Sequence, residues 1–218
     1  MTLEVRKISS PCAMELVLRY HYTGRKVGCR YAFGLFDQDE IIGCVCYSVP
    51  ASYTLCKGVC GEQYKKDVLE LSRLVIVNSL KNAASFLVAK SICMMENQVL
   101  VSYADPNVGH VGYVYQATNW IYTGQGNSEP CWLHPKTKQV ISKTRRHIDQ
   151  KAEKLGLNWK DLIKQPQEGK HRYVCFAGAK AYKKRAKKAL RYKKMQYPKG
   201  ESKRHEIDRG LKREETLF

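Results

Sequence analysis

Residues 99–126 read VLVSYADPNVGHVGYVYQATNWIYTGQG, and no other segment indicates as much about how this chain folds. Its first part, Val99 to Ala104, is apolar and β-branched enough to predict a buried strand. Asp105-Pro106-Asn107 ends that strand, because proline lacks an N–H and aspartate and asparagine readily form turns. Residues 113–120 then predict a short helix. Open α/β folds bind ligands where a strand runs through a turn into a helix, so we expect the active site here.

The loop and helix of this segment carry more polar and aromatic side chains than a simple connection needs. Tyr115 could act as a general acid beside a cleft, although a tyrosine in the core is the commoner arrangement. His110 and Asp105 could join His21 in a metal site of two histidines and one carboxylate, although lone histidines are usually structural. The polar and aromatic positions are Asp105, His110, Tyr113, Tyr115, Gln116, Asn119, Trp120 and Tyr122.

Periodic apolar residues along the rest of the chain predict a layered domain. Strands are expected over residues 3–8, 30–36, 41–49, 68–77, 99–104 and 171–176. Helices are expected over residues 11–20, 85–95, 113–120, 145–155, 159–164 and 180–194. Residues 50–66 look like a loop, and residues 131–143 have no defined pattern. The order of elements predicts an α/β (α+β) fold with a mixed twisted sheet flanked by helices.

Positive charge is concentrated toward the end of the chain. The 218 residues carry a formal net charge of +18, and the hydrophobic share of 44% is enough to form a core. From Lys170 onward the net charge is +12, against +6 for residues 1–169. This asymmetry favours nucleic acid over a membrane surface as the partner, although many solvated tails are basic.

The charge therefore predicts two parts: a catalytic domain over residues 1–178, and a basic C-terminal helix with a loose tail over residues 179–218. Lysines and arginines interleaved with tyrosines suit contacts with the phosphates of double-stranded DNA. The predicted DNA-binding residues are Lys183, Lys184, Arg185, Lys187, Lys188 and Arg191.

Nine cysteines are many for a chain of this size. The N-terminus lacks the apolar stretch of a secretory signal, and no run approaches the roughly 20 apolar residues of a membrane span. We therefore expect reduced thiols and a cytoplasmic location. Cys44, Cys46, Cys56 and Cys60 do not follow a common zinc spacing, so packing is favoured over a metal.

Arg73 stands within an otherwise apolar predicted strand. A buried arginine needs a partner, and Asp105 at the end of another strand is a candidate. An ion pair that only holds the sheet and a role in binding substrate are both open at this point.

Several motifs together resemble the phage Mom family, adenine-modification proteins that protect phage DNA from restriction. The central motifs are Glu70–Leu74, the helix over residues 82–91, Ser102–Pro106, Gly109–Gly112, Tyr115–Trp120 and Tyr122–Gly124. Further matches are His21-Tyr22, Pro50–Ser52, Lys170–Tyr173 and Tyr197–Gly200. The resemblance runs from about His21 to Gly200.

The resemblance implies a GNAT-like fold and a product, N6-carbamoylmethyladenine in double-stranded DNA. It places the family's functional positions on His21, Arg73, Ser91, Asp105 and Tyr115. Within this set, Tyr115 is a candidate general acid, Asp105 would orient or deprotonate the adenine amine, and Arg73 would hold a donor carboxylate. Ser91 or His21 would bind the donor or a metal.

Two further expectations concern the substrates. Adenine N6 is tied up by pairing and stacking, so its modification is helped by flipping the base. The residues expected to bind that base are Tyr103, His110, Tyr113, Asn119, Trp120 and Tyr122. GNAT enzymes hold the pyrophosphate of coenzyme A on a glycine-rich loop, whereas residues 78–85 contain no glycine. The resemblance therefore favours a glycine-derived donor, with Fe(II) as a candidate cofactor, over acetyl-CoA.

Two other functions remain open from the sequence. One is an N-acyltransferase that uses acetyl-CoA on a small amine or a protein. The other is a non-catalytic basic DNA-binding protein built on a GNAT scaffold. The absence of a glycine loop argues against the first, and the polar residues between Asp105 and Tyr122 argue against the second.

Overall fold

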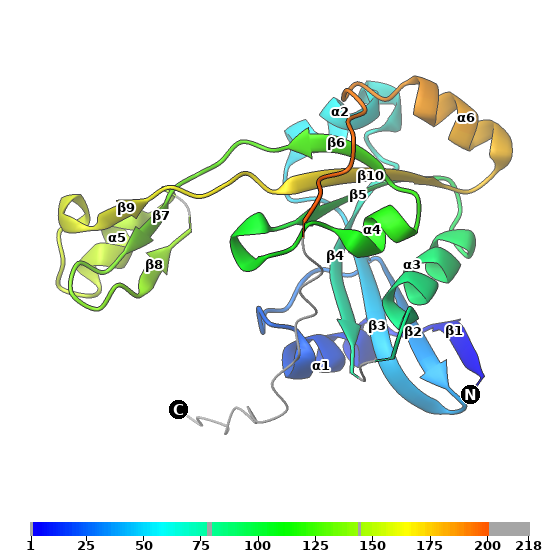
Figure 1. The fold of residues 1–218 in the computed structure, drawn as a ribbon, viewed down its shortest axis with the longest axis horizontal. Helices are drawn as coiled ribbons and strands as arrows, with labels where there is room; N and C mark the ends of the chain where they lie inside the picture. Colours follow the sequence, from blue (N-terminus) through cyan, green and yellow to red (C-terminus); the bar gives the residue numbers. More distant parts are fainter. Residues whose placement is uncertain (1, 78–79, 144, 201–218) are drawn as a thin grey trace.

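The computed structural model describes residues 2–77, 80–143 and 145–200 (Figure 1). Its strands are β1 (Leu3–Lys7), β2 (Tyr31–Asp37), β3 (Glu40–Ser48), β4 (Val68–Ile76), β5 (Gln98–Ala104), β6 (Ile121–Gln125), β7 (Cys131–Leu133), β8 (Val140–Ser142), β9 (Ile163–Gln165) and β10 (His171–Ala177). Its α-helices are α1 (Ser10–Tyr20), α2 (Tyr53–Cys60), α3 (Ala83–Cys93), α4 (Tyr113–Ala117), α5 (Ile148–Glu153) and α6 (Lys180–Lys188).

A seven-stranded sheet in the order β1-β2-β3-β4-β5-β10-β6 forms the centre of the protein. Neighbouring strands are antiparallel except β4 and β5, which are parallel. The predicted mixed sheet flanked by helices is confirmed, and each of the six predicted strands is present. The sequence pattern missed β6, a short edge strand that directly follows α4.

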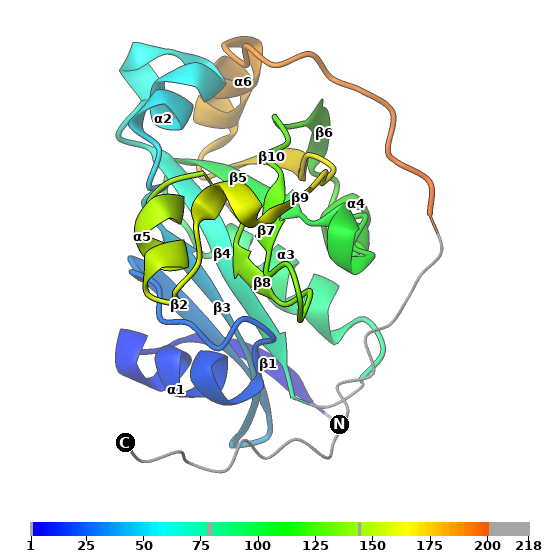
Figure 2. The ribbon, with the colours of Figure 1, turned by 90° about the vertical axis from the view of Figure 1, so that its left-hand side faces the viewer.

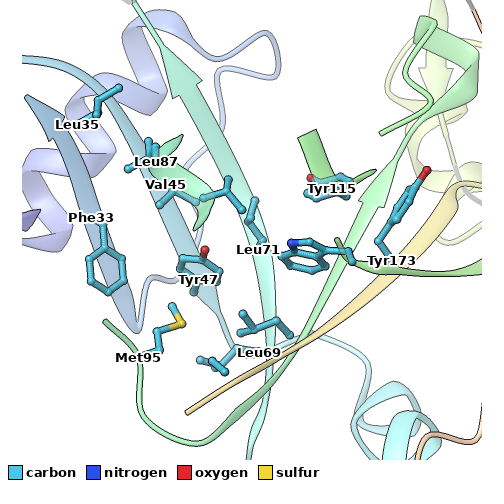
Figure 3. Close-up of a cluster of buried hydrophobic side chains, with 14 of the residues drawn as sticks. Phe33, Leu35, Val45, Tyr47, Leu69, Leu71, Leu87, Met95, Tyr115 and Tyr173 are labelled. Carbon is cyan, nitrogen blue, oxygen red and sulfur yellow. The ribbon is translucent and has the colours of Figure 1, made fainter. Parts of the chain in front are cut away.

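Helices cover both faces of this sheet. On one face, α3 and α4 pack over a core that includes Leu87, Tyr115 and Leu71 (Figure 3). On the other face, α1 covers one half of the sheet and α2 with α6 covers the other half. Cys44 and Cys46 are buried under α1, whereas Cys56 and Cys60 belong to the core under α2 and α6. These cysteines therefore pack in two separate cores, as small apolar side chains do.

The parallel strands β4 and β5 pair over only three residues and then separate. The last partners are Glu70 and Val101, beyond which β4 continues beside β3 and β5 continues beside β10. In Figure 1, β4 runs in a different direction from β5, β10 and β6. We call the place where this pairing stops the opening; it lies at the strand ends where α/β folds bind ligands.

A β-bulge on β4 arranges the side chains beside this opening. Cys46 pairs with Arg73 and Tyr47 with Leu71, so Ser72 is an additional residue on β4. Alternation along a regular strand would put residues three apart on opposite faces. The bulge instead puts Glu70 and Arg73 on one face, because bulges re-aim the side chains that follow them.

A small second unit interrupts the chain between β6 and β10. Strands β8, β7 and β9 form their own sheet, which packs with α5 around Trp132, Ile148, Ala152 and Leu162. Figure 1 shows this unit standing off the main sheet on two extended segments, and Figure 2 views the same unit end-on, in front of the sheet. We call residues 131–165 the insert. The prediction for this region was wrong in part: the first predicted helix is shorter, and the second is a single turn, Trp159–Asp161, followed by β9.

The C-terminal region differs from the predicted helix over residues 180–194. Helix α6 ends at Lys188, and an extended segment follows that packs back onto the main sheet. Arg191 N–H donates to the carbonyl of Val59, and Met195 N–H donates to the carbonyl of Tyr122 on edge strand β6. The Tyr197 hydroxyl donates to the carbonyl of Trp120 at 2.7 Å. The chain was predicted to be loose after Pro198, and residues 201–218 of that tail lie outside the described residues.

Residues 50–66 were predicted to be a loop, but they contain α2 and the turn Glu62–Tyr64. The helix has eight residues and buries only Cys56, Val59 and Cys60, which is too short a pattern to recognise. Ser52 begins it by accepting a hydrogen bond from Leu55 N–H. Among the helices of the described ranges, none has both the length and the apolar character that a membrane crossing requires.

Candidate functional site

Side chains from several distant segments gather at the opening between β4 and β5. Their charges or rings interact with one another, which places them in one cluster. We call this set the opening cluster. It consists of His21, Tyr22, Glu70, Arg73, Tyr103, Asp105, His110 and Lys170, and Tyr115 interacts with Tyr22 and Glu70 from the core on the opposite face. Four of the five predicted catalytic residues are therefore brought together.

His21 follows the last turn of α1 and is held by local hydrogen bonds. Its Nδ1 accepts from Thr23 N–H at 3.2 Å and lies 2.9 Å from Thr23 Oγ1, so the neutral ring carries its proton on Nε2. The ring stacks on Tyr22, whose ring meets His110 edge-on at 5.9 Å. Burial, and then the positive charges of Arg73 and His110, lower the pKa of His21 to about 4. His21 is therefore neutral at physiological pH.

The lowered pKa of His21 predicts a loss of stability in acid. Between pH 6.5 and pH 4, His21 binds a proton in the unfolded state, where its pKa is near 6.5, but stays unprotonated in the folded state. The folded state therefore becomes less stable relative to the unfolded state as pH falls through this range. With solvent screening of the half-buried ring, the expected loss attributable to His21 is about 1 kcal/mol. Urea unfolding at several pH values should show a smaller loss for His21→Gln than for the wild type. An equal loss would contradict the prediction, and exposed His147→Gln is the control.

Arg73 does not form the predicted ion pair with Asp105. Asp105 instead pairs with Lys170 at 3.7 Å, and its Oδ1 accepts from Asn107 N–H and Nδ2. Burial alone would raise the pKa of Asp105, but the Asn107 hydrogen bonds and the charge of Lys170 outweigh it and lower that pKa. Asp105 is therefore a firmly ionised and well-anchored carboxylate.

The guanidinium of Arg73 is left with unused hydrogen-bonding capacity. Its Nη1 donates to the Ser72 carbonyl at 2.7 Å, while its buried Nε has no partner among the residues that the structure describes. Within the same residues, no carboxylate lies at ion-pair distance from it. A half-buried arginine of this kind is suited to an anionic ligand, because carboxylates and phosphates match its planar donors.

Tyr115 is the end of a short hydrogen-bonded chain in the sheet. Ser102 Oγ lies 2.7 Å from the Tyr115 hydroxyl and 2.9 Å from the Leu71 carbonyl. A carbonyl only accepts, so Ser102 donates to Leu71 and the Tyr115 hydroxyl donates to Ser102. Burial raises the pKa of Tyr115 to about 12, so the phenol keeps its proton at neutral pH. This state suits a general acid rather than a base.

Ser91 lies apart from the opening cluster. Its side chain on α3 is fully buried, and its Oγ donates to the Val88 carbonyl at 2.9 Å while the Tyr47 hydroxyl lies 2.8 Å away. Its hydrogen bonds are thus internal to the core. The predicted contact of Ser91 with a donor has no geometry in this structure to support it.

The residues predicted to bind the base are dispersed. Trp120 and Tyr122 are buried in the core, where Trp120 packs on Tyr115 and the Tyr122 hydroxyl lies 2.8 Å from His171 Nδ1. Tyr113 is partly exposed and donates to the Gly200 carbonyl. Of the predicted set, Tyr103 and His110 belong to the opening cluster, and Asn119 lines a cavity beside α6.

Three members of the opening cluster were missed as site residues: Tyr22, Glu70 and Lys170. Burial raises the pKa of Glu70, although the charges of Lys170 and Arg73 oppose that shift. A signal was present, because Glu70 and Arg73 are the only charged residues in the apolar run 68–77. The sequence does not show, however, that Glu70 and Arg73 lie on the same face of β4, because that depends on the bulge at Ser72.

The predicted metal site is not formed by the residues that the structure describes. Across the described parts of the chain, no three His, Cys, Asp or Glu side chains are placed to hold a metal ion. His21, His110 and Asp105 therefore do not fit a two-histidine, one-carboxylate iron site. The glycine-free segment before α3 lies in part outside the described residues, and its remaining part ends at Asn82 in a left-handed conformation.

Gly112 connects the loop after β5 to α4, and its position requires glycine. Its φ is +79°, and a Cβ there would lie 2.5 Å from Cε2 of Tyr173. Gly112→Ala is therefore expected to lower the free energy of unfolding by about 1–3 kcal/mol, as measured by urea denaturation. Gly28→Ala is the matched control, since no atom lies within 4 Å of its added Cβ. Equal urea midpoints for the two variants would contradict the strain at Gly112.

The predicted DNA-binding side chains of α6 are all exposed, and Arg191 lies beyond the helix. Lys183, Lys184 and Lys187 line a cavity of about 410 Å³ beside β6 and β10. A larger cavity of about 730 Å³ lies between the end of α3 and the start of α6. Neither cavity includes a member of the opening cluster.

Comparison with solved structures finds acetyltransferases of similar fold. The ribosomal-protein-S18-alanine N-acetyltransferase from Escherichia coli has a TM-score of 0.45 at 10% identity, covering 82% of this chain and 96% of that one. An N-acetyltransferase from Staphylococcus aureus Mu50 has a TM-score of 0.45 at 11% identity, covering 81% and 99%. At such low identity the likeness concerns the fold and carries nothing about substrate.

Among curated proteins, no sequence matches this chain. A family model does match it, and the match extends over residues 2–199, nearly the whole of the described chain. That range includes both strands of the opening, the insert and α6. The chain therefore belongs to the Mom family of phage DNA-modification proteins.

Proposed function

We propose that this protein is a transferase that attaches a carbamoylmethyl group to N6 of adenine in double-stranded DNA and so protects the DNA from restriction. The observation that carries the proposal is the opening cluster, in which a half-buried arginine without a carboxylate partner lies on the same face as Glu70. Packing alone does not require such an arrangement. Membership of the Mom family suggests that its substrate is DNA.

Arg73 is the residue we assign to the donor. We write the glycine-derived donor as X–CH₂–C(=O)–NH₂, in which the leaving group X carries a carboxylate, and the planar donors of a guanidinium match that carboxylate. The low local dielectric of a half-buried site would strengthen this contact relative to water. The neutral ring of His21 lies close to Arg73 and would orient the donor without repelling its negative charge or adding a second positive one.

Glu70 is the residue we assign to proton removal. As the N6–CH₂ bond forms, the CH₂–X bond of the donor breaks and X departs with its electron pair, which leaves one proton too many on N6 for a base to take. Asp105 is a weak base because its pKa is lowered, whereas the pKa of Glu70 is raised by burial. We therefore give Asp105 the task of orienting the amine. Tyr115, which stays protonated, would give its proton to X as X leaves the donor.

Tyr22 is the residue we assign to the flipped base. Its ring is 66% exposed, lies between His21 and His110, and borders the opening. An exposed aromatic ring beside a catalytic group can stack on an extruded purine. The buried rings of Trp120 and Tyr122 would instead support α4 from within the core.

Restriction digestion tests this function. DNA from cells that express the protein should resist an endonuclease whose recognition site contains adenine, whereas DNA from cells with an empty vector should be cut. The unmodified state can be restored by copying the same DNA with a polymerase, and the copy should be cut again. Complete cleavage of the cellular DNA under good expression would overturn the proposal.

A further inference from the structure

We propose that the insert is a second surface for double-stranded DNA, which holds the duplex beside the opening cluster while α6 binds it elsewhere. This inference rests on the proposed function and adds a partner surface to it. The DNA-binding residues expected from the sequence are all in the C-terminal region, so the insert would be a separate contact.

The insert is strongly basic. Residues 131–165 contain nine Lys and Arg and three Asp and Glu, and all nine cationic side chains are exposed. Within the described residues, none of the nine forms an ion pair with a carboxylate. Unpaired positive charge at this density is the electrostatic signature of a surface that binds a polyanion.

The positive charges of the insert stand on a folded unit. The insert has its own core of Trp132, Ile148, Ala152 and Leu162. The guanidinium of Arg145 lies 4.1 Å from the centre of the Trp159 ring, a cation–π contact that holds the side chain in place. A preorganised set of cations loses less conformational entropy on binding phosphates than a disordered one.

The segments that link the insert to β6 and β10 are fixed to each other and to the loop that carries Asp105. Asn107 and Glu168 exchange two hydrogen bonds of 3.0 Å, and Gly126 N–H donates to the Lys170 carbonyl at 2.9 Å. Lys170 itself pairs with Asp105. The charge of Lys143, at the end of β8, also acts on Asp105. DNA bound by the insert would therefore lie next to the residues assigned to the chemistry.

The affinity of the protein for duplex DNA tests this surface. We would measure it by fluorescence anisotropy at several salt concentrations, with a duplex of about 30 base pairs and random sequence. The test variant is the full chain with Lys136→Gln, Lys138→Gln and Arg146→Gln. The control variant, Lys7→Gln, Lys81→Gln and Lys90→Gln, removes the same charge from exposed positions on β1, before α3 and on α3. The test variant is expected to bind about tenfold more weakly than the control and to lower the slope of log Kd against log salt by about two.

The outcomes separate the two proposals. Equal affinity and slope for test and control variants, with the wild type binding DNA, would overturn the role of the insert alone. A wild type that does not bind duplex DNA would overturn the proposed function. A photo-crosslinking residue at position 138 guards against misfolding, because it should crosslink to DNA in the otherwise unchanged chain while the same residue at position 81 should not.

Discussion

Tyr115→Phe is expected to lower adenine modification by about 10²–10⁴-fold while DNA binding stays unchanged. The substitution removes only the hydroxyl that donates to Ser102, and with it the protonated phenol beside the opening cluster. Ser102 would keep its bond to the Leu71 carbonyl, so the loss of stability should be about 1 kcal/mol. Modified nucleosides in cellular DNA and anisotropy with a duplex are the two measurements.

Tyr47→Phe is the matched control for that result. Tyr47 is also buried in the core under α3, and its hydroxyl lies 2.8 Å from Ser91 Oγ. Removal of this hydroxyl should cost a similar amount of stability and leave modification near the wild-type level. Full activity of Tyr115→Phe would remove that tyrosine from the mechanism. If Tyr115→Phe and Tyr47→Phe lost modification activity equally, the loss would result from lower stability and not from a role of Tyr115 in the reaction.

Arg73→Gln is expected to reduce modification by at least about 10²-fold, because a charge-assisted contact with a donor carboxylate is worth a few kcal/mol in a half-buried site. Arg73→Lys should recover only part of the activity, since lysine keeps the charge but lacks the planar pair of donors. The measurement is again the fraction of modified deoxyadenosine in DNA from expressing cells.

Stability distinguishes a ligand-binding arginine from a structural one. The Arg73 Nε is buried without a partner, so replacing the guanidinium should leave the free energy of unfolding unchanged or raise it. A structural arginine would show the opposite, a clear loss of stability. Arg30→Gln, which removes the same charge from an exposed position, should change neither activity nor stability. Full activity of Arg73→Gln would contradict the assignment to the donor.

The strands, and the turn that ends β5, could be predicted because local patterns encode them. Val99–Ala104 is apolar enough to be a buried strand, and Asp105-Pro106 ends it whatever the tertiary contacts are. The members of the opening cluster could be predicted only in part. Glu70 and Arg73 share a face only because Ser72 is an additional residue, and a one-residue bulge leaves no pattern in hydrophobicity.

The sequence also could not show which of the motif side chains are buried. Tyr22 and Trp120 both belong to family motifs, yet Tyr22 is exposed beside the opening and Trp120 is fully buried. Ser91 likewise lies in a motif but bonds only within the core. A motif records which residues matter, whereas the packing of α3 and α4 on the sheet decides which of them can touch a ligand.

The insert and the C-terminal segment show a different limit. Strands of three residues, such as β7 and β8, are too short for an alternating pattern to be recognised. The helix predicted over residues 180–194 ends early because Arg191 and Met195 donate their backbone N–H groups to α2 and β6. Such long-range hydrogen bonds compete with the helix and are invisible to local propensity.

Mass spectrometry of nucleosides tests most directly whether adenine in DNA is the substrate. DNA from cells expressing the wild-type protein should yield deoxyadenosine heavier by one carbamoylmethyl group, with fragmentation placing that group on the base. DNA from cells expressing Tyr115→Phe at the same level should yield almost none. Unmodified deoxyadenosine in cells that contain abundant, folded wild-type protein would contradict the assignment of this chain to adenine modification.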